Sequence, residues 1–329
     1  MDWSTILGNL LSPATLFFYL GFFAVLLRSD LEIPHPLPKL FSLYLLLSIG
    51  YTGGAKLAHA GLTGAVIVYI AAAMTMALVV PLYTFWVLRR ILNVYDAAAM
   101  AATYGSISVV TFVVGTDFLT KHGEPFGGYM VALMSLMESP AVIAGIMLVR
   151  VFAAPAVGTE AVERPGIAAL IRDSLLNGTV YLLLGSLAIG FLTGDNAGKG
   201  LEPFMSDLFK GVVIFFLLDT GMLAARRARL LVQVGPALAL FGIAAPLANA
   251  AAGISLSALL GMNVGDALLF TILCASASYI VVPAAMRQAV PEANPGLFEL
   301  LSLSVTFPLN VTVGVPMYYA VITHLWRAP

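Results

Sequence analysis

Long apolar segments recur along the whole chain, and no polar stretch between them is long enough for a separate soluble domain. Reading these segments between polar residues, glycines and prolines predicts ten transmembrane helices, each long enough to span a bilayer, which needs roughly 20 residues. Their approximate limits are 12–29, 36–54, 62–89, 94–120, 125–152, 168–193, 201–225, 230–261, 265–290 and 295–326. The pattern predicts an all-α polytopic membrane protein.

Composition supports this interpretation. The chain has 329 residues, of which 60% are hydrophobic and 10% charged, whereas soluble domains carry about 25% charged residues. The net charge of -1 gives no sign of nucleic-acid binding, and the single cysteine, Cys274, excludes a disulfide or a thiolate metal cluster within one chain. No cofactor is expected. Residues 1–12 lack a basic region and a cleavage site, so we expect the first helix to be retained.

Lysines and arginines divide unequally between the two ends of the predicted helices. One set of loops carries Arg28, Lys39, Arg89, Arg90, Arg150, Arg164, Arg172, Arg226, Arg227, Arg229 and Arg287. The other set carries Lys56, Lys121, Lys199, Lys210 and Arg327. The positive-inside rule places the first set in the cytoplasm. Both termini are then expected in the periplasm, with the protein in the bacterial inner membrane.

A polar linker, residues 153–167, divides the chain into halves of five predicted helices, 1–152 and 168–329. A shift of 170 residues aligns the halves at several positions: Asp96-Ala97 with Asp266-Ala267, Ser106 with Ser276, Ser108 with Ser278, and Pro125 with Pro295. Because five is odd, two such repeats have opposite topology in the membrane. Inverted repeats are typical of secondary transporters, with the substrate site between them. The alternative is chance similarity between two apolar sequences.

Both the fourth and the ninth predicted helix carry a polar centre. The fourth has Gly105, Ser106 and Ser108, and the ninth has Ser276, Ser278 and Tyr279. Two serines at i and i+2 point about 200° apart on a continuous helix, so both face one site only where the helix is broken. The N-terminal ends of two half-helices would then bind a small anion without lysine or arginine. Alternatively, these serines bond to the preceding turn or join helices.

Carboxylates inside apolar segments are the next candidates, because a buried charge in a membrane is costly and usually functional. Glu138 lies deepest, in the fifth helix, and is a candidate proton carrier or cation ligand. Asp219, before an expected helix interruption at 220–221, and Glu299 are expected at the interface or paired with Arg226 or Arg287.

Two polar residues of the tenth helix join Glu138 as candidates for binding a coupling ion. Asn310 and Thr312 follow Pro308, in a region that mirrors the surroundings of Glu138 in the first half. They could line the same cavity.

Several short motifs carry a resemblance to a known family. They are Ser12-Pro13, Ile33-Pro34, Gly-Tyr-Thr-Gly-Gly at 50–54, Met-Glu-Ser-Pro at 137–140, Pro-Glu-Ala-Asn-Pro at 291–295 and Val-Gly-Val-Pro at 313–316. With these motifs the chain resembles the sodium-dependent bicarbonate transporters of cyanobacteria and other bacteria over nearly its whole length.

The resemblance implies two inverted five-helix repeats, with helices 3–5 and 8–10 as a moving core and helices 1, 2, 6 and 7 as a scaffold. It also implies a homotrimer and an elevator-type cycle. Its substrate and sodium sites correspond here to Ser106, Ser108, Thr111, Ser276 and Ser278. The short linker weakens the case for a PII-like cytoplasmic regulator.

The chain departs from the family at its two polar centres. Tyr279 replaces an aspartate of the ninth helix, and Val109 and Val110 replace a glycine and a serine of the fourth. We therefore expect a secondary transporter of bicarbonate or a small carboxylate, coupled to Na+ or H+. One alternative is a proton-coupled carrier of another small solute, and another is a transport-inactive sensor or scaffold. No nucleophile–base pair indicates an enzyme.

Overall fold

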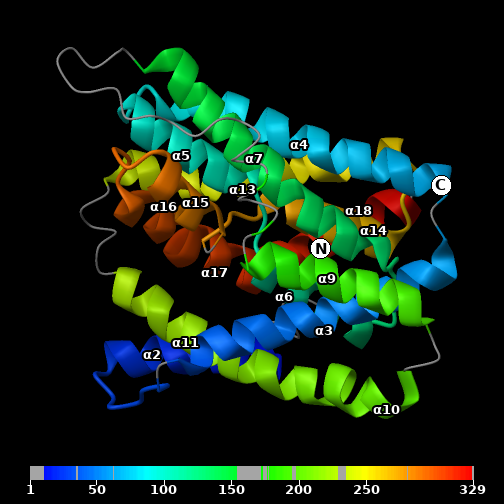
Figure 1. The fold of residues 1–329 in the computed structure, drawn as a ribbon. Helices are drawn as coiled ribbons and strands as arrows, with labels where there is room; N and C mark the ends of the chain where they lie inside the picture. The colour runs from blue at the N-terminus through cyan, green and yellow to red at the C-terminus, as the bar shows by residue number, and fades with distance from the viewer. Residues whose placement is uncertain are drawn as a thin grey trace.

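The computed structural model describes residues 11–34, 36–61, 63–153, 172, 176, 178–194, 198–228, 235–279 and 281–327, and all regular structure in these ranges is helical (Figure 1). The first half contains α2 (Pro13–Leu26), α3 (Leu37–Ala60), α4 (Gly64–Leu88), α5 (Val94–Gly105), α6 (Val109–Lys121) and α7 (Tyr129–Phe152). The second half contains α9 (Gly178–Thr193), α10 (Gly198–Glu202), α11 (Leu208–Ala228), α13 (Pro236–Leu259), α14 (Val264–Ala275), α15 (Val281–Ala289), α16 (Pro295–Leu301), α17 (Phe307–Leu309) and α18 (Val315–Arg327). Three π-helical turns adjoin these helices: η2 (Pro203–Asp207), η3 (Ser302–Thr306) and η4 (Asn310–Gly314).

Seven helical segments of the described residues are long and apolar enough to cross a membrane. They are Leu37–His59, Gly64–Leu88, Val94–Lys121, Tyr129–Phe152, Gly200–Ala228, Pro236–Leu259 and Pro295–Trp326. Shorter apolar helices cover Thr15–Leu26, Tyr181–Thr193 and Val264–Ala275. The chain is therefore a multi-pass helical membrane protein. Residues 154–167 of the predicted linker lie outside the described residues.

Helices α2, α3, α9 and α11 form a group that we call the four-helix layer (Figure 1). In it α2 packs against α11 and α3 against α9. Glycines allow these close contacts: a Cβ on Gly21 would lie 2.0 Å from the carbonyl oxygen of Leu218, and a Cβ on Gly221 would lie 2.1 Å from that of Phe18. Such small-residue contacts are common between membrane helices. Helix α11 runs through Gly221 without a break, so the interruption expected at 220–221 is wrong.

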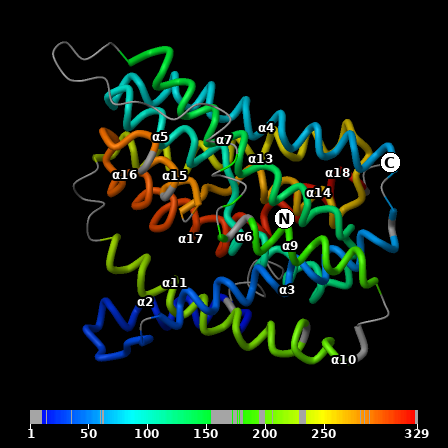
Figure 2. Tube along the Cα trace, in the orientation of Figure 1, coloured from blue at the N-terminus to red at the C-terminus, as the bar shows by residue number. Residues whose placement is uncertain are grey.

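The remaining long helices form the main body, with α5 and α14 at its centre. Every residue from Asp96 to Gly105 and from Gly265 to Ala275 is buried. Helices α4 and α7 pack on α5, and α13 and α18 pack on α14. Figure 2 shows that segments of the two halves, coloured cyan to green and yellow to red, lie together in this body.

The starts of α5 and α14 are capped in the same way. Asn93 accepts the Asp96 N–H at 2.9 Å, and Asn263 accepts the Asp266 N–H at 2.9 Å. Each aspartate then reaches a loop of the opposite half: Asp96 accepts the Asn294 N–H at 2.6 Å, and Asp266 accepts the Gly127 N–H at 2.7 Å. Capping aspartates 170 residues apart thus fix the loops that precede α16 and α7.

Candidate substrate site at two helix junctions

Two short non-helical segments meet inside the main body. Helix α5 ends at Gly105 and α6 begins at Val109, and we call the residues between them, 106–108, the first junction. Helix α14 ends at Ala275 and α15 begins at Val281, and we call residues 276–279 the second junction. The backbone is extended at Ser106 (φ -101°, ψ -177°) and at Ser276 (φ -87°, ψ 171°).

Serine side chains explain why the helices restart where they do. Ser108 precedes α6 and its Oγ accepts the Thr111 N–H at 3.3 Å. Ser278 Oγ likewise accepts the Val282 N–H at 3.2 Å, in the first turn of α15. Serine is among the best residues at a helix N-terminus, because its hydroxyl satisfies one of the free N–H groups there. Both serines therefore stand at helix N-termini that face the same region.

The junctions bond to each other by two different routes. The Ser278 N–H donates directly to the carbonyl oxygen of Thr103 at 2.9 Å. The Ser108 N–H donates at 2.9 Å to Ser276 Oγ, whose hydroxyl donates to the carbonyl oxygen of Leu273 at 3.2 Å. Residues 103 and 273 are related by the 170-residue shift, as are residues 108 and 278. The two connections are therefore equivalent, except that the Ser276 hydroxyl lies between the Ser108 N–H and the carbonyl oxygen of Leu273.

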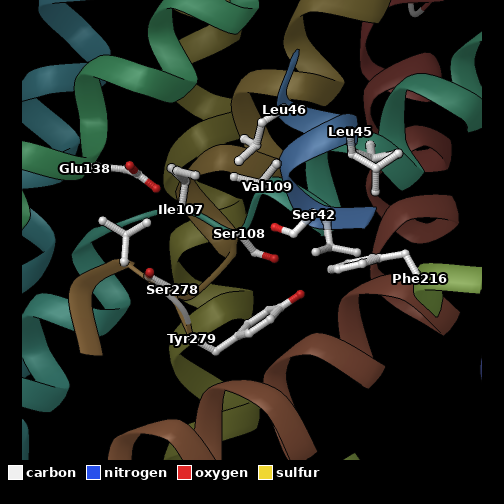
Figure 3. A pocket seen from close by; sticks show the side chains of 13 residues that line it. Ser42, Leu45, Leu46, Ile107, Ser108, Val109, Glu138, Phe216, Ser278 and Tyr279 are labelled. Carbon is white, nitrogen blue, oxygen red and sulfur yellow. The ribbon is translucent and has the colours of Figure 1, made fainter. Parts of the chain in front are cut away.

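A small cavity lies between the junctions and helices α3 and α11 of the four-helix layer (Figure 3). Its volume is about 20 Å³, close to the space that one water molecule needs. The lining residues are Ser42, Leu45, Leu46, Ile107, Ser108, Val109, Val110, Val113, Glu138, Phe216, Ser278, Tyr279 and Val281. The wall of the cavity therefore contains four hydroxyl groups and one carboxyl group, and the rest of it is apolar.

The structure brings four of the predicted site residues to this cavity: Ser108, Ser278, Tyr279 and Glu138. The Tyr279 hydroxyl is buried close to Ser108 but makes no hydrogen bond of ordinary geometry with a described residue. Its ring packs edge-on against Phe307 at 5.7 Å between centroids. In Figure 3 this hydroxyl points into the space beside Ser108. An unpartnered phenol in this place can donate a hydrogen bond to a bound anion.

Three other predicted substrate residues belong to the junction region without lining the cavity. Gly105 closes α5 against α4, where a Cβ would lie 2.2 Å from Cγ of Pro81. Ser276 bridges the junctions as described above. Ser106 Oγ is buried with no hydrogen-bond partner in the described part of the chain. The structure places these residues where they shape the junctions rather than where they would touch a ligand in the cavity.

The candidates for a coupling ion are spread over three places. Thr111 lies in the first turn of α6, with its buried Oγ1 unpaired among the described residues. Asn310 donates to the carbonyl oxygen of Ala275 at 2.9 Å and accepts from the Tyr318 hydroxyl at 2.8 Å. Thr312 donates to the carbonyl oxygen of Pro308 at 2.7 Å. Asn310 thus ties η4 to the end of α14, and neither Asn310 nor Thr312 lines the cavity.

The two deepest glutamates differ in their surroundings. Glu138 is 3% exposed and forms no ion pair with an arginine or lysine among the residues that the structure describes. Glu299 pairs with Arg287 and, at 2.6 Å, with Arg227. The expected pairing of Glu299 with Arg287 is confirmed, and the second cation is Arg227 rather than Arg226. Asp219 is half-buried in α11.

The lining residues that sequence reasoning missed include Ser42 of α3 and Phe216 of α11. Both belong to the four-helix layer. No motif or repeat marks them, because an isolated serine or phenylalanine in an apolar segment is common in membrane helices. Only the packing of α3 and α11 against the junctions reveals that they face the site.

Comparison with known proteins now supplies the family. A family model described as the Na+-dependent bicarbonate transporter superfamily matches residues 13–323, nearly the whole chain. The chain belongs to this superfamily. No curated protein matches it significantly. Membership confirms the resemblance seen in the sequence and indicates a membrane transporter rather than an enzyme.

Proposed function

We propose that the chain is a secondary transporter of a small anion, either bicarbonate or a small carboxylate, that works by alternating access. The observation that carries this proposal is the pair of serines, Ser108 and Ser278, which stand at two helix N-termini and line one cavity. Helix N-termini favour anions through free N–H groups and the helix dipole. No lysine or arginine is among the lining residues, so the helix ends are the positive groups of this site.

The arrangement of helices supports an inverted-repeat, elevator-type transporter of ten transmembrane helices. The matched caps at Asp96 and Asp266, each fixing a loop of the opposite half, are what repeats related by a pseudo-two-fold axis would produce. The cavity lies between the four-helix layer and the main body, as expected if the layer is a scaffold and the body carries the site across the membrane. We further propose a homotrimer, by analogy with the family.

The predicted residues divide into four roles in this proposal. Ser108, Ser278 and Tyr279 contact the anion, and Glu138 carries the coupling charge. Gly105, Ser106 and Ser276 position the junctions, while Thr111, Asn310 and Thr312 act on the coupling ion only if the cavity rearranges during the cycle.

Two observations favour coupling of anion uptake to protons rather than to Na+. Glu138 lines the cavity and has no ion-pair partner among the described residues. Tyr279 stands at the second junction, where its phenol supplies no full negative charge. Hard cations such as Na+ are usually bound by several oxygens that include carboxylates. We therefore expect the proton rather than Na+ to drive uptake.

The test is uptake of radiolabelled bicarbonate into proteoliposomes under an imposed pH gradient and, separately, an imposed Na+ gradient. Protein-free liposomes give the baseline for diffusion of CO2, and acetate, formate and pyruvate serve as competitors. We expect uptake that follows the pH gradient and persists when choline replaces Na+. A steep Na+ requirement would contradict proton coupling. Absence of uptake of every anion by folded protein would favour the transport-inactive sensor or scaffold.

A variant at the second junction can test whether a carboxylate there makes uptake depend on Na+. Tyr279→Asp places a carboxylate beside Ser278 and is expected to make uptake depend on Na+, whereas Tyr279→Asn, its uncharged match, is expected not to. Equal responses of the two variants to Na+ would show that the charge at position 279 does not decide the coupling ion.

A further inference from the structure

A second, larger cavity lies beside the candidate site. Its volume is about 220 Å³, and it is lined by Ser48, Ile49, Thr52, Gly53, Lys56, Phe112, Thr116, Asp117, Thr120, Phe126, Gly128, Val131, Met205, Phe209 and Lys210. Ile49 follows Leu45 of the candidate site by one turn of α3, and Phe112 follows Val109 by one turn of α6. The two cavities therefore lie about one helix turn apart along α3 and α6.

The larger cavity leads to the surface at its other end. An open space of about 660 Å³ around the loop before α7 shares Lys56, Thr120, Phe126 and Gly128 with it. We call these two spaces together the vestibule. A solute that enters at this loop thus passes through the vestibule before it reaches Ser108 and Ser278.

Two lysines from different helices of the four-helix layer line the vestibule, Lys56 of α3 and Lys210 of α11. Neither has an ion-pair partner among the residues that the structure describes. The Lys56 ammonium lies 4.0 Å from the centroid of the Phe126 ring, a cation–π contact that keeps the charge at the cavity wall without neutralising it.

The carboxylates of the vestibule, in contrast, are already engaged. Asp117 pairs with Lys121 at 2.5 Å, and Glu124 accepts a hydrogen bond from the Tyr319 hydroxyl at 2.9 Å. Glu124 keeps its negative charge, since the Tyr319 hydroxyl is neutral. Against this one carboxylate, two lysines that form no ion pair with a described residue still leave the charge of the vestibule positive. Cations in a cleft with low-dielectric walls raise the local concentration of anions and speed their capture.

We propose that Lys56 and Lys210 form a capture site for the transported anion, a small carboxylate or bicarbonate, on its way to the two junctions. This site rests on the proposed function only for the identity of the anion. The Lys and Arg asymmetry puts both lysines on the periplasmic side, so capture precedes uptake. The competing explanation is that two lysines near helix ends extend towards the membrane surface and have no role in transport.

Kinetics of anion uptake separate these explanations. Lys56→Gln and Lys210→Gln are each expected to raise the KM about threefold or more at low ionic strength, with Vmax within about twofold of the unmodified protein. The KM should also lose part of its dependence on salt. Lys39→Gln removes the same charge from the opposite end of α3 and is the matched control. A KM that matches that of Lys39→Gln would overturn the capture site.

A labelling experiment tests the vestibule without relying on transport. Cys274 is buried, so a thiol introduced by Thr52→Cys, in the same cavity wall as Lys56 and with both lysines kept, is the accessible one. We expect it to react faster with an anionic than with a cationic methanethiosulfonate, and the preference to fall when Lys210→Gln is added. Bicarbonate or acetate should slow the labelling. If the anion transported in the uptake assay fails to protect the thiol, the capture site is wrong while the proposed function stands. If the thiol is protected but nothing is transported, the proposed function fails instead.

Discussion

The first and second junctions are built from the same serines at positions 170 residues apart, yet they are not equivalent. Ser276 carries a hydrogen bond between the junctions, while its counterpart Ser106 has a buried hydroxyl without a partner in the described chain. Position 279 holds a tyrosine, whereas the equivalent position 109 holds a valine. A serine thus stands at the start of both α6 and α15, and the differences between the surrounding residues distinguish the two junctions. The first junction supplies an apolar wall and the second a phenol.

The strongest test of this asymmetry concerns Glu138 of the first half, because it is the carboxylate that lines the cavity between the junctions. The equivalent position of the second half is Pro308. A carboxyl group that binds and releases a proton in each cycle makes uptake depend on pH, and an amide cannot replace it. Glu138→Gln is expected to lower proton-driven uptake about tenfold or more, which corresponds to about 1.4 kcal/mol.

The melting temperature of the same preparation shows whether this variant still folds. Glu32→Gln, in an exposed loop, is the control for loss of a carboxylate. An alternative role for Glu138 is to stabilise the helix before Pro140, and that role predicts a lower melting temperature with an unchanged pH profile. Such a result would remove Glu138 from the site.

A second difference between the junctions lies at the helix ends that precede them, where Gly105 corresponds to Ala275. Gly105→Ala would place a methyl group against the Pro81 ring, whose Cγ lies 2.2 Å from the position of the new Cβ. Overpacking of this kind is expected to cost about 1–3 kcal/mol of unfolding free energy. Ala275→Gly, the reverse exchange, is expected to cost about 0.5–1 kcal/mol. Equal losses of melting temperature in detergent would contradict the asymmetric packing.

The bridging hydroxyl gives the next comparison. Ser276→Ala removes the acceptor of the buried Ser108 N–H, and an unsatisfied buried group costs about 1–3 kcal/mol. Ser106→Ala removes a hydroxyl that makes no hydrogen bond among the described residues, so its effect on the unfolding free energy is expected to be below about 0.5 kcal/mol. Thermal unfolding in one detergent compares the pair. A larger loss for Ser106→Ala would show that the bridge is assigned to the wrong serine.

Much of the helical architecture could be predicted from the sequence, because each membrane crossing needs a long apolar segment. The tenth predicted helix shows the limit. The structure confirms one helical segment over the predicted range, Pro295–Trp326, but the π-helical turns η3 and η4 interrupt its α-helical hydrogen bonding, which the sequence does not predict. Where an α-helix changes to a π-helical turn depends on contacts with neighbouring helices. Asn310 of η4, for example, is oriented by its hydrogen bond to the carbonyl oxygen of Ala275.

In the candidate site, too, features that depend on local sequence could be predicted, whereas features that depend on packing between helices could not. The repeat pointed to Ser108 and Ser278, since a repeated polar pair in an apolar segment is visible in one sequence. The capping pattern Asn-Val-x-Asp-Ala, present at 93–97 and 263–267, would have strengthened the repeat further. The role of Ser42 and the bridging by Ser276 could not be predicted, because both depend on which helix faces which. The expected interruption at 220–221 failed for that reason too, as Gly221 serves close packing against α2.

The smallest expected effect concerns the phenol that distinguishes the second junction from the first. Tyr279→Phe keeps the ring and its contact with Phe307 but removes a hydroxyl that bonds to no described residue. The melting temperature is therefore expected to stay unchanged. If the hydroxyl donates to the bound anion, its loss removes about 0.5–1.5 kcal/mol, and the KM for uptake should rise about two- to tenfold with Vmax nearly constant. Tyr181→Phe, which removes an exposed phenol of α9 outside the cavity, is the control and should leave the KM within about twofold. A Tyr279→Phe protein with an unaltered KM would show that the phenol only fills space, and that the anion is held by Ser108, Ser278 and the helix N-termini alone.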